Sequence, residues 1–236
     1  MPIFFQHQVN ETTRLGIWKI EEAEEFFLTN VPLQKEVTHP HKRLQHLAGR
    51  FLLQFLFPGF PYELIKIADT RKPYLPNEQY HFSISHCGDY AAAIVSNNQR
   101  VGIDIEIPSP KVEKIKEKFL NEKELKMFLR EVLTGNLQSN SYRDSMLNVQ
   151  IPNLELITLN LPTGQAGSEL LTLLWSAKEA IYKWNGDGGV DFRKHILLDR
   201  QHEGEGTINC LFTKTDEQLT VHYRYFEHLI LAWVIS

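Results

Sequence analysis

The sequence predicts an α+β fold made of two similar halves, each with one long helix followed by antiparallel strands. Apolar residues recur at helical spacing over 41–57 and again over 169–184, and short apolar segments suited to strands follow each helix. One expected strand in each half also ends alike, in residues 93–96 and in residues 233–236. Short apolar strings of this kind also recur by chance, so an internal duplication is one of two interpretations of that likeness.

The first half comprises residues 1–108. Residues 19–36 begin with several glutamates and predict a helix followed by a turn, and the helix over 41–57 should stop at Pro58-Gly59. Strands are expected at 64–68, 81–86, 90–96 and 101–107, with a hairpin turn at 87–89.

The second half comprises residues 109–236. A Lys/Glu-rich helix is expected over 112–133, and the polar stretch 134–169, with its Gly, Asn, Ser and Pro residues, predicts a long insertion. The helix over 169–184 should end at the glycine-rich segment 185–189. Strands are expected at 208–213, 219–226 and 229–235.

Composition and charge exclude several classes of protein. The chain has 236 residues, 42% hydrophobic residues and a formal net charge of −4, which argue against disorder and against general nucleic-acid binding. No apolar run approaches the roughly 20 residues that span a bilayer, and the first residues lack the pattern of a secretion signal. Cys87 and Cys210 form no disulfide framework. We therefore expect a cytoplasmic protein with no nucleic-acid and no membrane partner.

Two carboxylates on one predicted strand are the sharpest chemical feature. In the strand 101–107, side chains alternate between faces, so Asp104 and Glu106 point the same way and Gly102 leaves room beside them. Neighbouring carboxylates repel each other unless a cation lies between them, and hard oxygen ligands suit Mg²⁺. The alternative, about equally weighted on this motif alone, is an exposed acidic face of an ordinary sheet.

The helix over 169–184 offers a third carboxylate and a lysine. Glu179 and Lys183 are four residues apart and share one side of the helix. Glu179 could be a further metal ligand, and Lys183 could hold a phosphate oxygen or assist proton transfer. Taken alone, the pair is also explained as an exposed ion pair worth about 0.3–0.5 kcal/mol.

Cationic and hydrogen-bonding residues are scattered upstream of the acidic strand. Lys42 and Arg43 begin a helix, Lys72 lies in a turn, and Ser85 and His86 end a strand. Several phosphate groups would need such donors from different segments. Each residue also has an ordinary structural explanation: a solvated helix face, a turn lysine, or a histidine bonded to backbone.

The order of these motifs resembles that of the 4′-phosphopantetheinyl transferase superfamily. The series covers residues 40–235 and is similar to the long, monomeric, surfactin-type branch rather than the short, trimeric branch. Its two most specific motifs are Gly-Ile-Asp-Ile-Glu and Trp-Ser-x-Lys-Glu-Ala, in that order. The motifs lie at residues 71–73, 81–86, 102–106, 119–124 and 175–183.

The resemblance implies a pseudo-dimer of two α+β halves that binds coenzyme A in the cleft between them. The implied reaction moves the 4′-phosphopantetheine arm to a serine of an apo carrier protein and releases adenosine 3′,5′-bisphosphate. The implied roles are Mg²⁺ ligands (Mn²⁺ as an alternative) for Asp104, Glu106 and Glu179, pyrophosphate contact for Lys183, and coenzyme A phosphate contacts for Lys72, Ser85 and His86. Lys42 and Arg43 match the family's variable basic segment, and Glu124 matches a family glutamate. Glu179 or a metal-bound hydroxide could accept the serine proton.

The implied partner is an apo acyl or peptidyl carrier protein, which is small and acidic. Residues 111–130 contain many lysines and several apolar residues, so we expect the carrier to dock there, unless the apolar side of this segment is core. Two other functions remain open. One is a binding module for coenzyme A or carrier protein that has lost turnover, and the other is a different Mg²⁺-dependent nucleotide-phosphate enzyme, although no GxxxxGK[ST] loop is present.

Overall fold

The computed structural model describes residues 3–31, 37–133, 165–199 and 206–236. Its strands are β1 (Ile3–Gln8), β2 (Thr13–Lys19), β3 (Lys66–Ile67), β4 (Pro73–Tyr74), β5 (His81–Cys87), β6 (Tyr90–Ser96), β7 (Val101–Glu106), β8 (Ile196–Asp199), β9 (Thr207–Phe212), β10 (Glu217–Tyr225) and β11 (Ile230–Ile235). Its helices are α1 (Glu24–Asn30), α2 (Pro40–Leu56), α3 (Lys116–Phe119), α4 (Glu122–Leu133), α6 (Gln165–Asn185) and α7 (Phe192–His195), with short 3₁₀ helices at Tyr62–Leu64 and Val112–Ile115.

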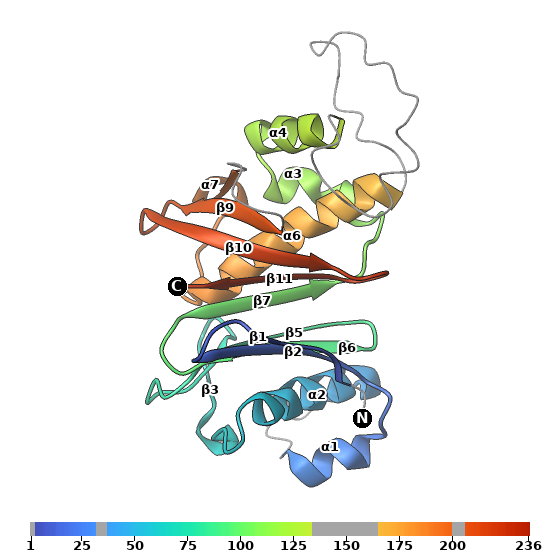
Figure 1. Ribbon diagram of the computed structural model, residues 1–236, viewed down its shortest axis with the longest axis vertical. Helices are drawn as coiled ribbons and strands as arrows, with labels where there is room; N and C mark the ends of the chain where they lie inside the picture. The colour runs from blue at the N-terminus through green and yellow to red at the C-terminus, as the bar shows by residue number, and fades with distance from the viewer. Residues whose placement is uncertain (1–2, 32–36, 134–164, 200–205) are drawn as a thin grey trace.

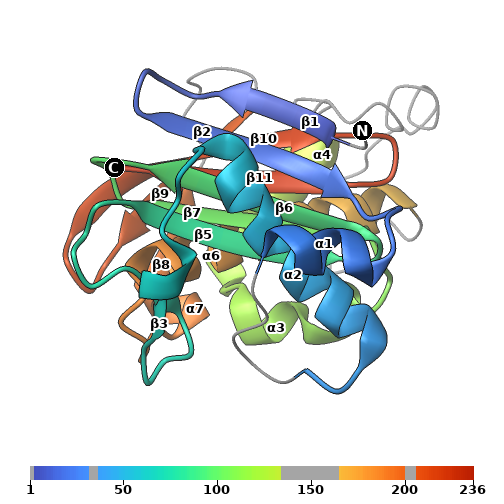
Figure 2. The same cartoon turned by 90° about the horizontal axis from the view of Figure 1, so that it is seen from below.

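The predicted α+β class is confirmed. The larger sheets are antiparallel throughout, one with the strand order β1-β2-β6-β5 and the other with β7-β11-β10-β9-β8. They lie face to face in the middle of the molecule (Figure 1), with α2 on the outer side of the first and α6 on the outer side of the second. The view from below places α2 across the first sheet, with the hairpin β1–β2 at one edge (Figure 2).

Three apolar clusters hold these layers together. One joins α2 to the four-stranded sheet, and another joins α6 to the five-stranded sheet. The third lies between the two sheets and includes Ile103 and Ile105 of β7 together with Leu15 and Ile17 of β2. Because side chains alternate along a strand, the inward-facing isoleucines of β7 leave its acidic residues on the side of α6.

Strand β7 connects the two sheets. It pairs antiparallel with β11, so its hydrogen bonds place it in the second sheet although it lies within residues 1–108. Its other edge meets β5 of the first sheet, where the backbone N–H of Ile103 donates to Ser83 Oγ at 3.2 Å. The division of the chain at residue 108 stays a prediction. Strand β7 lies before that residue, yet it pairs with β11 of the second sheet and contacts β5 of the first.

Several expected elements are confirmed, and two expectations need correction. The helix expected over 41–57, the strands expected over 81–86 and 90–96, and those expected in the C-terminal region match α2, β5, β6, β9, β10 and β11. The continuous helix expected over 112–133 is wrong, because the chain breaks after Leu120 and α4 begins anew. Asn121 Oδ1 accepts from the N–H of Glu124, and Glu124 Oε2 accepts from the N–H of Asn121, which is a capping box.

The strand expected over 64–68 is largely replaced by a 3₁₀ turn at Tyr62–Leu64 and the two-residue strand β3. Most of the insertion expected over 134–169 lies outside the described residues, and its last residues belong to α6, which begins at Gln165. Within the described part of the chain, no helix is long and apolar enough to cross a membrane.

Candidate active site

Strand β7 presents its carboxylates to helix α6. Asp104 is 2% exposed, and Gly102, two residues earlier, lets the helix come very close: a Cβ at that position would lie 2.0 Å from the Ala180 carbonyl oxygen and 2.7 Å from the Trp184 nitrogen. Only glycine allows this approach, because any side chain there would push α6 away from the strand. The glycine of the Gly-Ile-Asp-Ile-Glu motif therefore brings α6 against the acidic face.

One face of α6 meets Asp104. Ser176, Glu179 and Lys183 occupy positions i, i+3 and i+7 and so share this face. Ser176 Oγ donates to Asp104 Oδ2 at 2.9 Å, and Lys183 Nζ donates to Asp104 Oδ1 at 2.6 Å. The two ends of the helical face thus bind the two oxygens of one carboxylate, which fixes its orientation.

Strand β5 completes the group from the first sheet. Ser85 Oγ donates to Asp104 Oδ1 at 2.7 Å and accepts from Lys183 Nζ at 2.9 Å. Residues from β5, β7 and α6 therefore converge on one carboxylate. The structure brings together Ser85, Asp104 and Lys183, which the sequence predicted as separate parts of one site.

The two glutamates have raised pKa values. Burial, followed by the negative charge of Asp104, raises the pKa of Glu179 to about 7, while Lys183 opposes the shift. Burial and Asp104 also raise the pKa of Glu106, against hydrogen bonds from Cys87 and Trp175. Because each glutamate responds to the charge of Asp104, the three carboxylates share one patch, with Lys183 as the cation within it.

The donor chemistry of this patch suits a hard divalent cation, but the side chains are not closed around one. In the part of the chain that the structure describes, no group of three His, Cys, Asp or Glu side chains is arranged to hold a metal ion. Asp104 is instead bound by Lys183 and two serines. The oxygens of Glu106 and Glu179, with raised pKa values, are those that gain most from a nearby positive charge. Metal ligation by the three carboxylates stays a prediction.

Two adjoining cavities open beside this patch. The smaller, of about 220 Å³, is lined by Lys183, Tyr182 and Ser83 among others. The larger, of about 940 Å³, reaches His86. Arg71, Pro73 and Ile84 line both cavities, so the cavities are neighbours, and we call the two together the groove.

The larger cavity is lined by basic side chains from three segments: His46 and Arg50 of α2, Arg71 of the turn before β4, and His86 of β5. Arg50 is 5% exposed and its Nη1 lies 2.6 Å from His46 Nε2. Its Nε is buried and has no hydrogen-bond partner among the described residues. A buried guanidinium nitrogen without a partner is costly, and a bound anion would satisfy it.

Of the two predicted basic residues at the start of α2, only Lys42 is electrostatically linked to the groove, through His86. Lys42 is exposed, and its charge is one of the causes that lower the pKa of His86, after burial and Lys183. Arg43 turns the other way: its Nε binds Glu24 Oε1 at 2.7 Å and its Nη1 donates to the Val37 carbonyl. A role for Arg43 in coenzyme A binding stays a prediction without support from its contacts.

Lys72 lines the smaller cavity, but its amine binds protein backbone. Lys72 Nζ donates to the Trp184 carbonyl at the end of α6, at 3.1 Å. The predicted contact between Lys72 and a coenzyme A phosphate therefore competes with a bond that the residue already makes.

Ser176 and His46 were given no role at this site by the sequence. Arg50 and Arg71 were noted among the scattered cationic donors, but they were not among the expected site residues. Ser176 could have been found from its spacing of three to Glu179 and seven to Lys183. Arg50 lies on the buried side of α2, one residue after Gly49. Arginine is rarely buried without a partner, so its position on an apolar helix face indicates a binding role. Arg71 has a φ of +68, a left-handed backbone conformation that is unusual for arginine and that its residue type does not predict.

Comparisons with known proteins place the chain in a family. Residues 100–234, more than half of the chain, match the family model described as the 4′-phosphopantetheinyl transferase superfamily. The chain is 27% identical over 195 residues to enterobactin synthase component D of Escherichia coli K12, covering 81% of this chain and 76% of that protein. It is similar to the same component of Shigella flexneri, with 27% identity over 198 residues and the same coverage. The matched family region contains β7 and α6, and with them Asp104, Glu106, Glu179 and Lys183.

Proposed function

The chain belongs to the 4′-phosphopantetheinyl transferase superfamily and is an enzyme of phosphopantetheine transfer, and on this premise we propose its substrates and site. We propose that it moves the 4′-phosphopantetheine arm of coenzyme A to a serine hydroxyl of an apo acyl or peptidyl carrier protein. The second product is adenosine 3′,5′-bisphosphate. We also assign it to the long, surfactin-type branch and expect it to act as a monomer, since β5 and α6 of the same chain both bind Asp104.

The convergence at Asp104 is the observation that supports this proposal most. Ser85, Ser176 and Lys183 reach its two oxygens from two further elements, and the groove beside them runs to the cations around Arg50. An acidic patch with one lysine, next to a basic groove, suits a substrate with separate anionic groups. Coenzyme A has such groups in its diphosphate and its 3′-phosphate.

We place the phosphates of coenzyme A along the groove. His86 and Lys183 lie at the end near Asp104, where they would contact the diphosphate. Arg50, with its partnerless Nε, lies in the larger cavity together with Arg71 and would bind a further phosphate. Lys42 is close enough to influence His86 and would add positive charge at the rim.

We propose that Asp104, Glu106 and Glu179 hold Mg²⁺, or Mn²⁺, when coenzyme A is bound. The ion would neutralise negative charge on the diphosphate. Lys183 now binds the same oxygen of Asp104 that Ser85 binds, and its side chain is 25% exposed, so it has room to turn toward a phosphate oxygen. The carboxylate patch would thus exchange the Lys183 ammonium group for the metal ion.

The reaction needs a proton acceptor for the carrier serine. The serine oxygen forms a bond to the phosphorus that bears pantetheine, and the bond from that phosphorus to the bridging oxygen breaks. Its electron pair stays on the 5′-phosphate of the leaving adenosine 3′,5′-bisphosphate. We propose that Glu179 takes the serine proton, because a carboxylate held beside the diphosphate site is placed to act as a general base.

We place the carrier protein at residues 111–130. Phe119, Leu120 and Phe128 are buried in the core, so the apolar side of this segment is not free for a partner. Its exposed surface is rich in lysine instead: Lys111, Lys114, Lys118, Lys123 and Lys126 all face solvent. An acidic carrier helix would therefore be attracted by charge rather than by an apolar groove.

Mass spectrometry tests the proposed reaction directly. The full-length protein is incubated with coenzyme A, Mg²⁺ and a panel of apo acyl and peptidyl carriers. We expect at least one carrier to gain the mass of one phosphopantetheine arm, with adenosine 3′,5′-bisphosphate formed in equal amount. Replacing Mg²⁺ by a chelator should stop the gain, and the Lys66→Met variant, altered at an exposed position of β3, should not.

The outcomes separate this function from a binding module. If no carrier gains mass but coenzyme A binds in calorimetry, the chain has retained the groove without turnover. If neither occurs, the assignment of the groove to coenzyme A is wrong.

A further inference from the structure

The C-terminal end of α6 is capped by a turn from the other half of the chain. The last carbonyl groups of any helix lack partners within the helix. Here the Tyr182 carbonyl accepts from the N–H of Gly186 at 3.1 Å. The Trp184 carbonyl accepts from Lys72 Nζ at 3.1 Å, and the Gly186 carbonyl accepts from Thr70 Oγ1 at 2.9 Å. Two of these three bonds come from residues more than 100 positions earlier in the sequence.

The turn lies directly on the glycine backbone that ends the helix. Gly186 has φ +77, and a Cβ there would lie 2.5 Å from Lys72 Nζ and 2.7 Å from Lys72 Cδ. Gly188 has φ +71, and a Cβ there would lie 2.8 Å from Thr70 Cγ2. The left-handed conformation needs glycine at both positions, and the absent side chains make the space that Thr70 and Lys72 fill.

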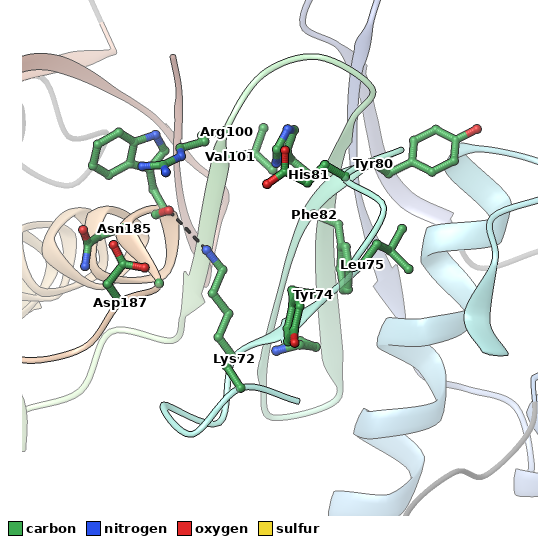
Figure 3. A pocket seen from close by; sticks show the side chains of 15 residues that line it. Lys72, Tyr74, Leu75, Tyr80, His81, Phe82, Arg100, Val101, Asn185 and Asp187 are labelled. Atoms are coloured by element: carbon green, nitrogen blue, oxygen red, sulfur yellow. Dashed lines mark hydrogen bonds between the residues drawn. The ribbon is translucent and has the colours of Figure 1, made fainter. Parts of the chain in front are cut away.

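The amine of Lys72 reaches the end of α6 between two cavities. Figure 3 shows its side chain extending from the turn toward the end of α6, where the dashed line marks the bond to the carbonyl. A cavity of about 290 Å³ lies on one side, lined by Arg100 and Asp187 among others, and the groove lies on the other. A cation at the C-terminal end of a helix is also favoured by the helix dipole.

We infer that Thr70 and Lys72 are positioning residues that cap α6 and thereby hold Lys183 against Asp104 and Ser85. Lys183 lies one residue before Trp184, whose carbonyl Lys72 binds, so loosening this end of the helix would move the Lys183 amine first. This inference rests on the proposed function of Lys183. The family resemblance implies that Lys72 contacts a coenzyme A phosphate. Our inference assigns Lys72 to the end of the helix instead.

Binding and turnover distinguish the two roles. For Lys72→Met we expect kcat to fall about tenfold, while the Kd for adenosine 3′,5′-bisphosphate changes by no more than about twofold. Thr70→Val removes one cap bond and keeps the shape of a side chain that carries no charge, so we expect about a threefold lower kcat with little change in Kd. Lys66→Met and Thr220→Val, at exposed positions of β3 and β10, serve as matched controls.

Hydrogen exchange supplies a readout that needs no activity. In both cap variants, the amides of residues 184–189 should exchange about tenfold faster, while those of β10 stay unchanged. A large rise in the Kd for adenosine 3′,5′-bisphosphate with unchanged exchange would overturn the inference and make Lys72 a phosphate ligand. If the cap variants exchange faster but the unaltered protein modifies no carrier, the cap is supported and the proposed function is rejected.

Discussion

Two lysines on helix α6 form ion pairs with carboxylates, yet their surroundings differ. Lys178 Nζ lies 2.7 Å from Glu124 Oε1, with both side chains almost fully buried, and also donates to the carbonyls of Phe192 and Ile196. Its three ammonium protons are therefore all used. Lys183 binds Asp104 at 2.6 Å with its own side chain 25% exposed, at the wall of a cavity.

The carboxylate partners differ in the same way. Glu124 also accepts from the N–H of Leu198 and from the N–H of Asn121, so it ties α4 and β8 to α6. Asp104 is bound mainly by side chains, those of Ser85, Ser176 and Lys183, which can rotate. The comparison teaches that a pair closed by backbone groups holds the fold, whereas a pair closed by side chains beside a cavity can exchange partners with a ligand.

Removing Lys178 should have the largest effect on stability. Lys178→Met leaves the buried Glu124 charge without its cation, so we expect the free energy of unfolding to fall by about 3–5 kcal/mol. Lys183→Met should cost less than Lys178→Met, since Lys183 is partly solvated and two serines still bind Asp104. Urea unfolding of both variants measures the difference, and equal losses would contradict the comparison.

The double variant Glu124→Gln with Lys178→Met supplies the control. It removes both charges together, so it should recover part of the stability that Lys178→Met loses. A double variant less stable than the sum of the two single losses would show that the pair does not act as a unit.

Removing Asp104 should have the largest effect on activity. Asp104→Asn keeps the size of the side chain but removes the charge that organises the patch, so we expect kcat/KM for carrier modification to fall about 10³-fold. The free energy of unfolding should change by less than about 2 kcal/mol, because Lys183 can turn to solvent. Steady-state kinetics together with circular dichroism measure both, and near-normal activity would remove Asp104 from the active site.

The close approach of α6 to β7 can be disturbed at Gly102. Gly102→Ala places a methyl group against the Ala180 carbonyl and the Trp184 nitrogen, both backbone atoms, so we expect a loss of about 3 kcal/mol and a parallel loss of activity. At Gly49, a Cβ meets the Ile84 side chain instead, at 2.6 Å, and that chain can rotate. Thermal unfolding should therefore show a smaller loss for Gly49→Ala.

The pH dependence of stability should reveal Lys72, which binds a carbonyl rather than a carboxylate. Burial, followed by the charge of Arg100, lowers the pKa of Lys72 from 10.5 to about 8. Between these values the folded protein has released a proton that the unfolded chain still holds, so stability should rise with pH from about 8 to 10.5, by about 1–2 kcal/mol. In urea unfolding measured across the same pH range, Lys72→Met should lack this rise in stability. If stability still rises with pH in that variant, other groups cause the rise.

The sequence by itself determined the local arrangement. Alternation along β7 predicted that Asp104 and Glu106 share a face, and the structure places Val101, Ile103 and Ile105 in the cluster between the sheets. Helical spacing placed Glu179 and Lys183 on one side of α6. The N-terminal hairpin was missed, because Leu15–Trp18 in β2 are buried on both faces and show no alternation.

Only the tertiary structure decided which segments meet. Ser85 and Asp104 bind each other because β5 and β7 lie side by side, although they belong to different sheets. Arg43 binds Glu24, and Lys72 caps α6, although neither bond follows from a motif. The physical reason is that the period of a sequence fixes the direction of a side chain relative to its own element, whereas its partner depends on how distant elements pack.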